Sequence, residues 1–479
     1  MLIRVLRKIP SGMTFFALVV ILLGFVSENF VRTVLLAGVI GLAAWAVFVR
    51  VQTLSDRACR RLQLVLCAAQ LVMLAVFACN LAVAPAWDFG RVYHATLDIT
   101  THGRLAYTND YFMSCYNNFF LTWLLVIPFK VFSVFGVHPL AAGIILNIAA
   151  IACSYLFLML AADLWFSWQR GTFFGICCLV CFPLATYAPV FYTDTLSMPF
   201  AAATVLIAVV LYKKNCSPRQ QAALALLLGA VLFFGFKIKP TAAIPAIALA
   251  LDALLRKRRG ALRFMAAVVC VFAVMYAGYQ FAEKNSGVID LTDLSKNKLT
   301  VTHYVMMGLK GHGEYNPDDH AFSASFATNE ERQKANVEEI VRRLKEYGPD
   351  GYLEFLFRKI RYTWTDGTYF GPETLNIDPL GGGAFRAVFT SEGQWHPVYA
   401  AIMKGAQLLL IAGMLVALFS KDPLDWSMST AVLGIFLFLL FWETRSRYLV
   451  NMLPVFMLLY TSGMELLWQK WNLRAKANR

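Results

Sequence analysis

The chain alternates between long apolar segments and short polar ones. A helix needs about 17–25 apolar residues to cross the hydrocarbon layer of a membrane. Thirteen segments reach or approach that length, at residues 11–27, 31–49, 63–84, 116–136, 139–164, 172–189, 195–212, 220–236, 241–255, 262–282, 399–419, 426–441 and 448–468. Because a helix satisfies its own backbone hydrogen bonds in lipid, this pattern predicts an all-α polytopic membrane protein.

The composition agrees with this prediction. Of the 479 residues, 59% are hydrophobic and 15% are charged, and the mean hydropathy is +0.58. A soluble domain carries roughly 25% charged residues, so the composition excludes a soluble globular protein. Most of the 10 cysteines lie within apolar segments, and no CxxC…CxxC or HExxH spacing is present. The cysteines are therefore interpreted as small hydrophobic residues rather than as disulfide partners or zinc ligands.

The formal net charge of +14 comes from short basic clusters between the apolar segments. Lys and Arg concentrate in the cytoplasmic loops of membrane proteins, so this charge indicates topology and argues against a nucleic-acid partner. The clusters lie at residues 4–8, 50–61, 213–219, 256–263 and 470–479. All of them fall on the cytoplasmic side only if the apolar segment 116–136 does not cross the membrane.

The segment 116–136 is therefore predicted to be an interfacial helix, which leaves about twelve spanning helices. Residues 1–282 would form a transmembrane module that includes a first outer loop at 85–115. Residues 283–398 would form an extracytoplasmic loop domain, and 399–479 the last transmembrane helices and a cytoplasmic tail. We expect a multi-pass cell-membrane protein with both termini in the cytoplasm and its polar sites on the outer face.

The first outer loop carries the first candidate for chemistry. Asp88 stands between Trp87 and Phe89, aromatic residues that favour the membrane–water boundary. Arg91 and His94 follow at helical spacing and are candidate substrate-binding residues. A partly desolvated carboxylate can act as a general base toward a hydroxyl group, although a lone Asp at a helix end is also an ordinary solvated residue.

Two further polar positions stand at the outer ends of apolar segments. Asp194 follows Tyr192 in a Tyr-Thr-Asp-Thr string, where it could cap a helix or bind an acceptor or a cation. Lys239 precedes Pro240, which breaks the helix and holds the lysine in one place. A phosphate group is a suitable partner for a lysine held in this way.

The turn at 443–448 holds Glu443, Arg445, Arg447 and Tyr448 between two apolar segments. Charged residues at the edge of a membrane are costly and indicate function. Arginine also binds phosphate oxygens in a bidentate manner. The alternative is an internal ion pair between Glu443 and one of the arginines that braces the two helices.

The predicted loop domain contains two features of interest. An amphipathic helix is expected at 329–348, with Val337 and Val341, Ile340 and Leu344 on one stripe. Upstream, the glycine-rich segment 307–319 collects His312, Glu314, Asp318 and Asp319, of which Glu314 is a candidate substrate ligand. No diagnostic ligand spacing is present, so no cofactor is predicted and a divalent cation stays an open alternative.

Taken together, Asp88, the interfacial helix, Asp194, Lys239-Pro240 and Arg445-Ser446-Arg447-Tyr448 resemble the GT-C class of membrane glycosyltransferases. The similar branch includes protein O-mannosyltransferases and aminoarabinose transferases. The resemblance implies an inverting sugar transfer from a polyprenyl-phosphate donor, with Asp88 as the base and Asp194 as a second acidic residue. It also implies that Lys239 and the two arginines face the lipid phosphate. Phe89 departs from the pattern, since the mannosyltransferases often have Glu there.

The leading hypothesis is a glycosyltransferase that moves a sugar from a polyprenyl-phosphate donor to a lipid, polymer or protein acceptor of the cell envelope. Membrane lipid is then also a partner. A polysaccharide polymerase or ligase of another fold is the first alternative, but Asp88 in the first outer loop favours the transferase. The second alternative is a transporter or flippase, which would show paired repeats and polar residues near the membrane midplane.

Overall fold

The fold was examined in a computed structural model that describes residues 2–107, 109–292 and 298–477. Residue 108 of the predicted outer loop, residues 293–297 of the predicted loop domain and the last two residues of the predicted tail lie outside the described residues. The described residues form helices joined by turns, and their one β-type contact is an isolated bridge between Val83 and Pro379. The predicted all-α class is confirmed.

The described residues up to Asn285 form 16 helical elements. They are α1 (Leu2–Gly24), α2 (Phe30–Gln52), α3 (Asp56–Asn80), α4 (Trp87–His102), α5 (Asn109–Ser114), η1 (Tyr116–Asn118), α6 (Phe119–Val134), α7 (Pro139–Trp165), α8 (Trp168–Leu179), α9 (Phe182–Ala185), α10 (Thr193–Leu196), α11 (Met198–Lys213), α12 (Pro218–Ile238), η2 (Pro240–Ala243), α13 (Ile244–Leu255) and α14 (Ala261–Asn285). Local signals set several of these boundaries. The Ser217 hydroxyl and Gln220 form a capping box at the start of α12, which satisfies amide groups that the helix leaves unpaired.

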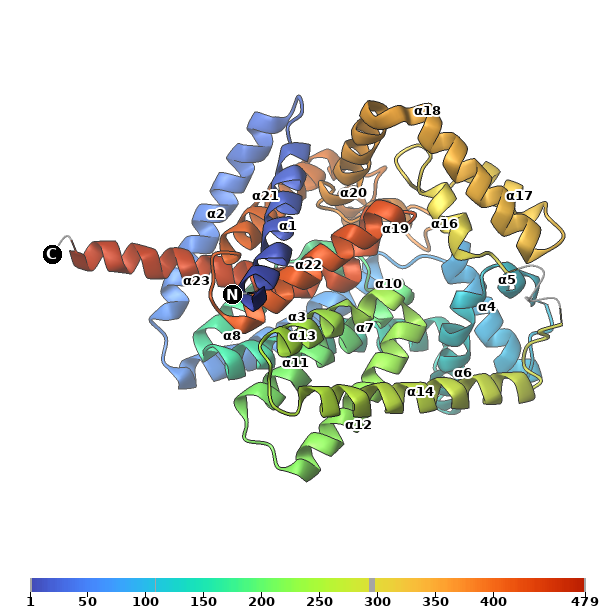
Figure 1. Cartoon of the computed structure of the whole chain (residues 1–479), viewed down its shortest axis with the longest axis horizontal. Coiled ribbons are helices and arrows are strands. Elements are labelled where there is room, and N and C mark those ends of the chain that lie inside the picture. The colour runs from blue at the N-terminus through green and yellow to red at the C-terminus, as the bar shows by residue number, and fades with distance from the viewer. Residues whose placement is uncertain (1, 108, 293–297, 478–479) are drawn as a thin grey trace.

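The second half begins with the segment predicted to form a loop domain, for which the name loop domain is kept, and ends with three long helices. The elements are α16 (Val301–Met307), α17 (Pro317–Ala324), α18 (Asn329–Trp364), α19 (Gly371–Leu375), α20 (Ala384–Phe389), α21 (His396–Ala417), α22 (Pro423–Phe441), η3 (Ser446–Met452) and α23 (Leu453–Ala477). In Figure 1, α18 stands with α16 and α17 at the same side of the molecule as α4 and α5.

Eleven helices in the described residues are long and apolar enough to cross a membrane. Ten of them coincide with predicted spans, and the eleventh is Tyr116–Val134, the segment predicted to be interfacial. The two other predicted spans, 172–189 and 241–255, do not form long helices. The polytopic membrane architecture is thus confirmed, while two predicted spans are not long helices and the segment predicted to be interfacial is long and apolar enough to cross.

The predicted span at 172–189 is interrupted because α8 ends at Leu179 and only the short α9 follows. Pro183 lacks an amide hydrogen and restricts the residue before it, which disfavours a continuous helix from α8 and suits a new helix start at α9. The Asn147 side chain of α7 donates to the backbone oxygens of Tyr187, Ala188 and Val190 at 2.7, 3.0 and 3.2 Å. This buried amide satisfies the irregular segment that leads to Tyr192 and Asp194.

The predicted span at 241–255 is divided in a similar way. A 3-10 turn, η2, begins at Pro240, and α13 then runs only from Ile244 to Leu255. Together they form an apolar helical segment of 10–17 residues, which is shorter than a full span. The break places Lys239 in an extended conformation between α12 and η2 rather than within a continuous helix.

The helix α6 contacts the turn at residues 191–192 through both its start and its middle. Asn118, just before α6, accepts a hydrogen bond from the Tyr192 hydroxyl at 3.1 Å. Phe129, in the middle of α6, packs against Phe191 with ring centroids 6.2 Å apart. In Figure 1, α6 runs steeply while α14 lies along the horizontal axis. These contacts fix α6 against the turn that leads to Asp194, while the interfacial position of this segment stays a prediction, because its length and composition would also allow it to cross a membrane.

Small residues allow the last helices to pack closely. Gly413 of α21 and Gly463 of α23 face each other so tightly that a Cβ atom on Gly463 would lie 2.1 Å from the Gly413 oxygen. Close approach of backbones at glycine is a common way to pack helices in membranes, where dispersion contacts replace the hydrophobic effect. The same α23 begins directly after η3, so this packing holds the 443–448 turn in place.

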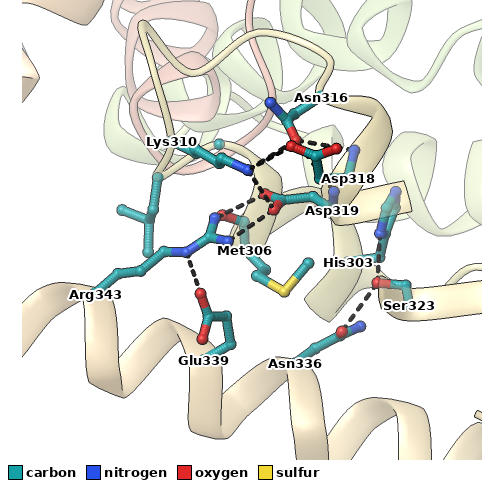
Figure 2. Close-up of polar contacts among 12 residues, drawn as sticks. His303, Met306, Lys310, Asn316, Asp318, Asp319, Ser323, Asn336, Glu339 and Arg343 are labelled. Carbon is teal, nitrogen blue, oxygen red and sulfur yellow. Dashed lines mark hydrogen bonds and ion pairs between the residues drawn. The ribbon is translucent and has the colours of Figure 1, made fainter. Parts of the chain in front are cut away.

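The loop domain is braced by a buried polar network on one face of α18 (Figure 2). Arg343 forms a bidentate ion pair with Asp319, with both N–O distances at 2.7 Å, and a further bond of 2.6 Å to Glu339. Lys310 lies 3.4 Å from the carboxylates of Asp318 and Asp319. These contacts hold α17 and the segment after α16 against α18. The bidentate contact between Arg343 and Asp319 is stronger than an ion pair with a single hydrogen bond.

The amphipathic helix predicted at 329–348 is present, and α18 continues beyond a kink at Gly348 to Trp364. Its apolar stripe, however, faces outward, because Val337, Val341 and Leu344 are 46%, 43% and 37% exposed. The buried face carries Asn336 and Arg343 instead. The difference arises because α16 and α17 dock on α18 through the polar network rather than through the apolar stripe.

Acid is expected to loosen this network through His303. The ring is 1% exposed and lies 2.7 Å from the Ser323 hydroxyl, and its burial lowers the pKa to about 4. The unfolded segment, with a His pKa near 6.5, binds more protons, so stability falls as pH drops from about 6.5 to 4, by roughly 3 kcal/mol in total. Limited proteolysis of the purified protein at pH 7.5 and 4.5 measures this change.

The neighbouring charges of Asp319, Arg332 and His320 are part of the same titration, since all three act on His303. A His303→Gln variant provides the control, because its amide keeps a hydrogen bond to Ser323 without a titrating group. The variant should show the same cleavage between residues 301 and 343 at both pH values. Equal protection of the wild-type protein at the two pH values would contradict the prediction.

Candidate active site

Four chain segments that are far apart in the sequence meet at one end of the helix bundle. They carry Asp88 at the start of α4, Asp194 in α10, Lys239 between α12 and η2, and Arg447 in η3. A hydrogen bond of 2.9 Å from Asn451 to the Thr241 hydroxyl joins η3 to η2. We call the assembly of these four residues with Trp87, Tyr192, Glu443 and Tyr448 the central cluster.

Asp194 forms the ionic centre of this cluster. Its side chain is nearly buried, at 4% exposed, and it forms an ion pair with Lys239. The second carboxylate oxygen lies 3.4 Å from Arg447 Nε. Two cations on one carboxylate leave a net positive charge, and breaking such a buried pair is costly. Asp194 therefore holds two cations in a fixed position.

Arg447 lies against aromatic rings. Its guanidinium carbon is 4.7 Å from the ring centroid of Trp87 and 5.7 Å from those of Tyr192 and Tyr448. Cations over aromatic faces are stabilised by the ring quadrupole. Arg447 Nε is buried and has no hydrogen-bond partner among the described residues. A buried guanidinium with spare donors is suited to bind an anionic group.

Trp87 has an uncommon backbone conformation next to the candidate base. Its φ angle is +43°, in the left-handed region that L-residues rarely adopt. Its ring packs edge-on against Tyr192 at 5.1 Å as well as under Arg447. Backbone strain of this kind persists only where the surroundings impose it, and it gathers at functional sites. The conformation places Asp88 at the start of α4, facing the cluster.

Asp88 is held by hydroxyl groups rather than by a cation among the described residues. It accepts a hydrogen bond of 2.8 Å from the Tyr111 hydroxyl, and the Tyr192 hydroxyl lies 3.5 Å away. Asn118 connects the two tyrosines, because it donates to Tyr111 at 2.6 Å and accepts from Tyr192 at 3.1 Å. Burial raises the pKa of both tyrosines, so both hydroxyls stay protonated and can orient the carboxylate.

Glu443 is a second buried carboxyl group beside the cluster. It is 8% exposed and accepts a hydrogen bond of 2.7 Å from the Tyr448 hydroxyl. Burial raises the pKa of Glu443, although the nearby charges of Arg445 and Arg447 oppose that shift. Within the described part of the chain, neither arginine forms an ion pair with it. The alternative of a Glu–Arg brace in this turn is therefore not what the structure contains.

The two arginines of the turn point to different places. Whereas Arg447 joins Asp194, the guanidinium of Arg445 lies 4.2 Å from the ring centroid of Phe370. Between them, the Ser446 hydroxyl donates to Asp366 at 2.6 Å. The sequence treated Arg445 and Arg447 as one phosphate-binding pair, whereas in the structure Arg447 in η3 contacts Asp194 and Arg445, just before η3, lies over Phe370.

Three other predicted ligands lie outside the central cluster. Arg91 and His94 are exposed on α4, and their side chains form no hydrogen bond or ion pair with the described residues of the cluster. Glu314 accepts a hydrogen bond of 2.7 Å from the His312 amide within its own loop. That loop still covers the site, because the Gly313 oxygen accepts a 2.7 Å bond from the Thr444 amide.

The sequence did not single out Tyr111, Asn118 or Lys359. Lys359 is 1% exposed and donates to the backbone oxygens of Gly308, Leu440 and Trp442 at 2.7, 3.1 and 2.7 Å. Burial lowers its pKa to about 7, against the opposing charge of Glu443. It ties the loop domain to the end of α22. A lone lysine in a charged helix carries no local signal of this role.

A metal site is not formed by the acidic residues predicted as alternatives. Among the described residues, no group of three or more His, Cys, Asp or Glu side chains is placed to hold a metal ion. Asp318 and Asp319 pair with Lys310 and Arg343 instead, as Figure 2 shows. The central cluster presents carboxylates, cations and hydroxyl groups.

The helices and the buried polar cluster define an integral, polytopic, all-helical membrane protein. A family model described as "conserved hypothetical integral membrane protein" matches residues 7–466, and the chain belongs to this family. No curated protein matches the sequence significantly. Among solved structures, the chain is similar to ArnT from Cupriavidus metallidurans bound to undecaprenyl phosphate, with 14% identity and a TM-score of 0.38. That alignment covers 84% of this chain and 77% of ArnT.

Proposed function

We propose that this protein is a glycosyltransferase that moves a sugar from a polyprenyl-phosphate donor to an acceptor hydroxyl on the outer face of the membrane. The observation that carries the proposal is the arrangement of charge in the central cluster. Among the described residues, the Asp88 carboxylate contacts the hydroxyl groups of Tyr111 and Tyr192, while Lys239 and Arg447 are paired with Asp194 and Arg447 lies over the rings of Trp87 and Tyr192. A free carboxylate and a pair of fixed cations are what such a reaction requires.

In the proposed reaction, Asp88 accepts the proton of the acceptor hydroxyl. At the same time, the oxygen of that hydroxyl attacks the anomeric carbon of the donor. The bond between that carbon and the phosphate oxygen breaks, and the lipid phosphate leaves with the electron pair. Its developing negative charge is stabilised by Arg447 and Lys239, which Asp194 holds in place. One direct displacement inverts the configuration at the anomeric carbon.

The buried position of the cations supports a phosphate rather than a soluble polyanion. The Lys239 and Arg447 side chains are each 13% exposed, and aromatic rings surround the arginine. In such an environment of low dielectric constant, electrostatic contacts are stronger than at an open surface. A lipid-linked phosphate can reach this depth at the ends of spanning helices without leaving the membrane.

A deletion strain tests the function directly. Without this protein, one envelope lipid, polymer or protein should lack the mass of a single sugar, and the polyprenyl-phosphate sugar should accumulate. Mass spectrometry of envelope glycans and extracted lipids, with and without a plasmid copy of the gene, measures both changes. Unchanged glycans would contradict the proposal. Loss of whole repeat units would indicate a polymerase instead. Accumulation of the donor in the inner leaflet would indicate a flippase.

A further inference from the structure

A second polar site lies between the end of α18 and the first turns of α21. It is an open pocket of about 460 Å³. The lining residues are His312, Arg358, Arg361, Tyr362, Thr365, Asp366, Gly367, Ala400 and Lys404. None of these belongs to the central cluster. We call this site the α18–α21 pocket.

Two cations of the pocket have no ionic partner. Arg358 forms an ion pair of 2.8 Å with Glu354, but Arg361 and Lys404 form none with any residue that the structure describes. They are close enough for their like charges to repel. Two unpaired cations that share a concave site leave a positive potential there, which an anion would neutralise.

The one carboxylate that lines the pocket is already engaged. Asp366 Oδ1 accepts hydrogen bonds from the Thr368 amide and hydroxyl at 2.9 and 2.6 Å. Its Oδ2 accepts from the Phe370 amide at 2.9 Å and from the Ser446 hydroxyl at 2.6 Å. Because these bonds hold the carboxylate in a turn, it does not form an ion pair with Arg361 or Lys404.

The pocket lies where two membrane-spanning helices end. The last residue of α1, Gly24, packs against Arg361 and Thr365, since a Cβ atom there would lie 3.6 Å from the Arg361 Cα. Lys404 belongs to the span His396–Ala417. Leu23 of α1 and Val398 of α21 are 53% and 46% exposed, so both helices offer apolar surface near the pocket.

We infer that the α18–α21 pocket binds the phosphate-bearing head group of a membrane lipid. The cations would bind the phosphate oxygens, and the acyl chains would lie along the exposed apolar side chains of α1 and α21. A lysine within a spanning helix is costly unless it reaches the interface or a partner, and a lipid phosphate supplies one. A volume of about 460 Å³ lies within the range of small-ligand sites. This site is independent of the catalytic role of Asp88.

Native mass spectrometry of the full chain in detergent tests the site with defined probes. We expect dioleoyl phosphatidic acid to bind the wild-type protein and phosphatidylcholine, whose head group has no net charge, to bind far more weakly. The double variant Arg361→Gln/Lys404→Gln should bind phosphatidic acid at least about tenfold more weakly, because charge-assisted hydrogen bonds are lost.

The control is Lys334→Gln/Lys345→Gln, which removes the same charge from exposed positions of α18 and should bind phosphatidic acid as the wild type does. Equal binding of phosphatidic acid by the wild type and the Arg361/Lys404 double variant would overturn the inference, as would an equal loss in the Lys334/Lys345 control. Inorganic phosphate that displaces the lipid at equal concentration would show a soluble anion to be the occupant and overturn it too.

Discussion

An Asp88→Asn variant is expected to lower the rate of sugar transfer by a factor of about 10²–10⁴, the usual contribution of a general base. The amide is close in shape to the carboxylate and can still accept hydrogen bonds from Tyr111 and Tyr192, so the site should keep its geometry. It cannot take up the acceptor proton. The measurement is single-sugar transfer from a polyprenyl-phosphate donor by the purified protein.

The loss should appear in kcat, with the KM for the donor nearly unchanged, because Asp88 does not touch the cations that would bind the phosphate. Asp110→Asn is the matched control, since Asp110 is an exposed carboxylate in the neighbouring α5. It should transfer sugar at the wild-type rate. If the Asp88 variant also transferred at a near-normal rate while remaining monodisperse in detergent, Asp88 would have no part in the mechanism.

Replacement of Arg447 by Ala should lower kcat/KM for the donor by a factor of about 10²–10³, as loss of one preorganised electrostatic contact does. The effect should be large because Arg447 is buried and its Nε has no hydrogen-bond partner among the described residues. Lys239 remains on Asp194 in this variant, so the carboxylate keeps one ionic partner. Transfer rates at varied donor concentration give the change.

Arg32→Ala serves as the control, because Arg32 is an exposed arginine near the start of α2. An Arg447→Lys variant should recover part of the activity, since it restores the charge but not the bidentate geometry. Equal losses of kcat/KM in Arg447→Ala and Arg32→Ala would show that the central cluster has only a structural role. A loss confined to the acceptor's KM would place the donor phosphate elsewhere.

The membrane class and most of the helices follow from the sequence alone. A long run of apolar residues predicts a membrane-spanning helix whatever segments pack against it. Ten of the predicted spans accordingly form long helices. Of the two exceptions, one contains Pro183 and the other directly follows Pro240, and both lie next to polar contacts that the hydropathy pattern does not predict. Asn147 illustrates this, because it satisfies the backbone after Pro183 from another helix.

The candidate residues could be found from the sequence because a charged residue at the end of an apolar segment is easy to recognise there. Asp88, Asp194, Lys239 and Arg447 all stand at such ends, and the structure brings them together. Tyr111 and Asn118 gave no such signal, since tyrosine and asparagine are common residues in polar segments and at the start of a helix. Their role depends on hydrogen bonds to Asp88 and Tyr192 that only the folded chain forms.

The sequence by itself thus determined the class of protein, the helical segments and the ends at which polar chemistry gathers. Tertiary structure decided the pairings: Asp194 with two cations, Asp88 with two hydroxyl groups, and Arg445 apart from Arg447. The physical reason is that helix periodicity and hydropathy are local properties of the chain. Which helix ends become neighbours depends on side-chain packing between segments, which no local pattern records.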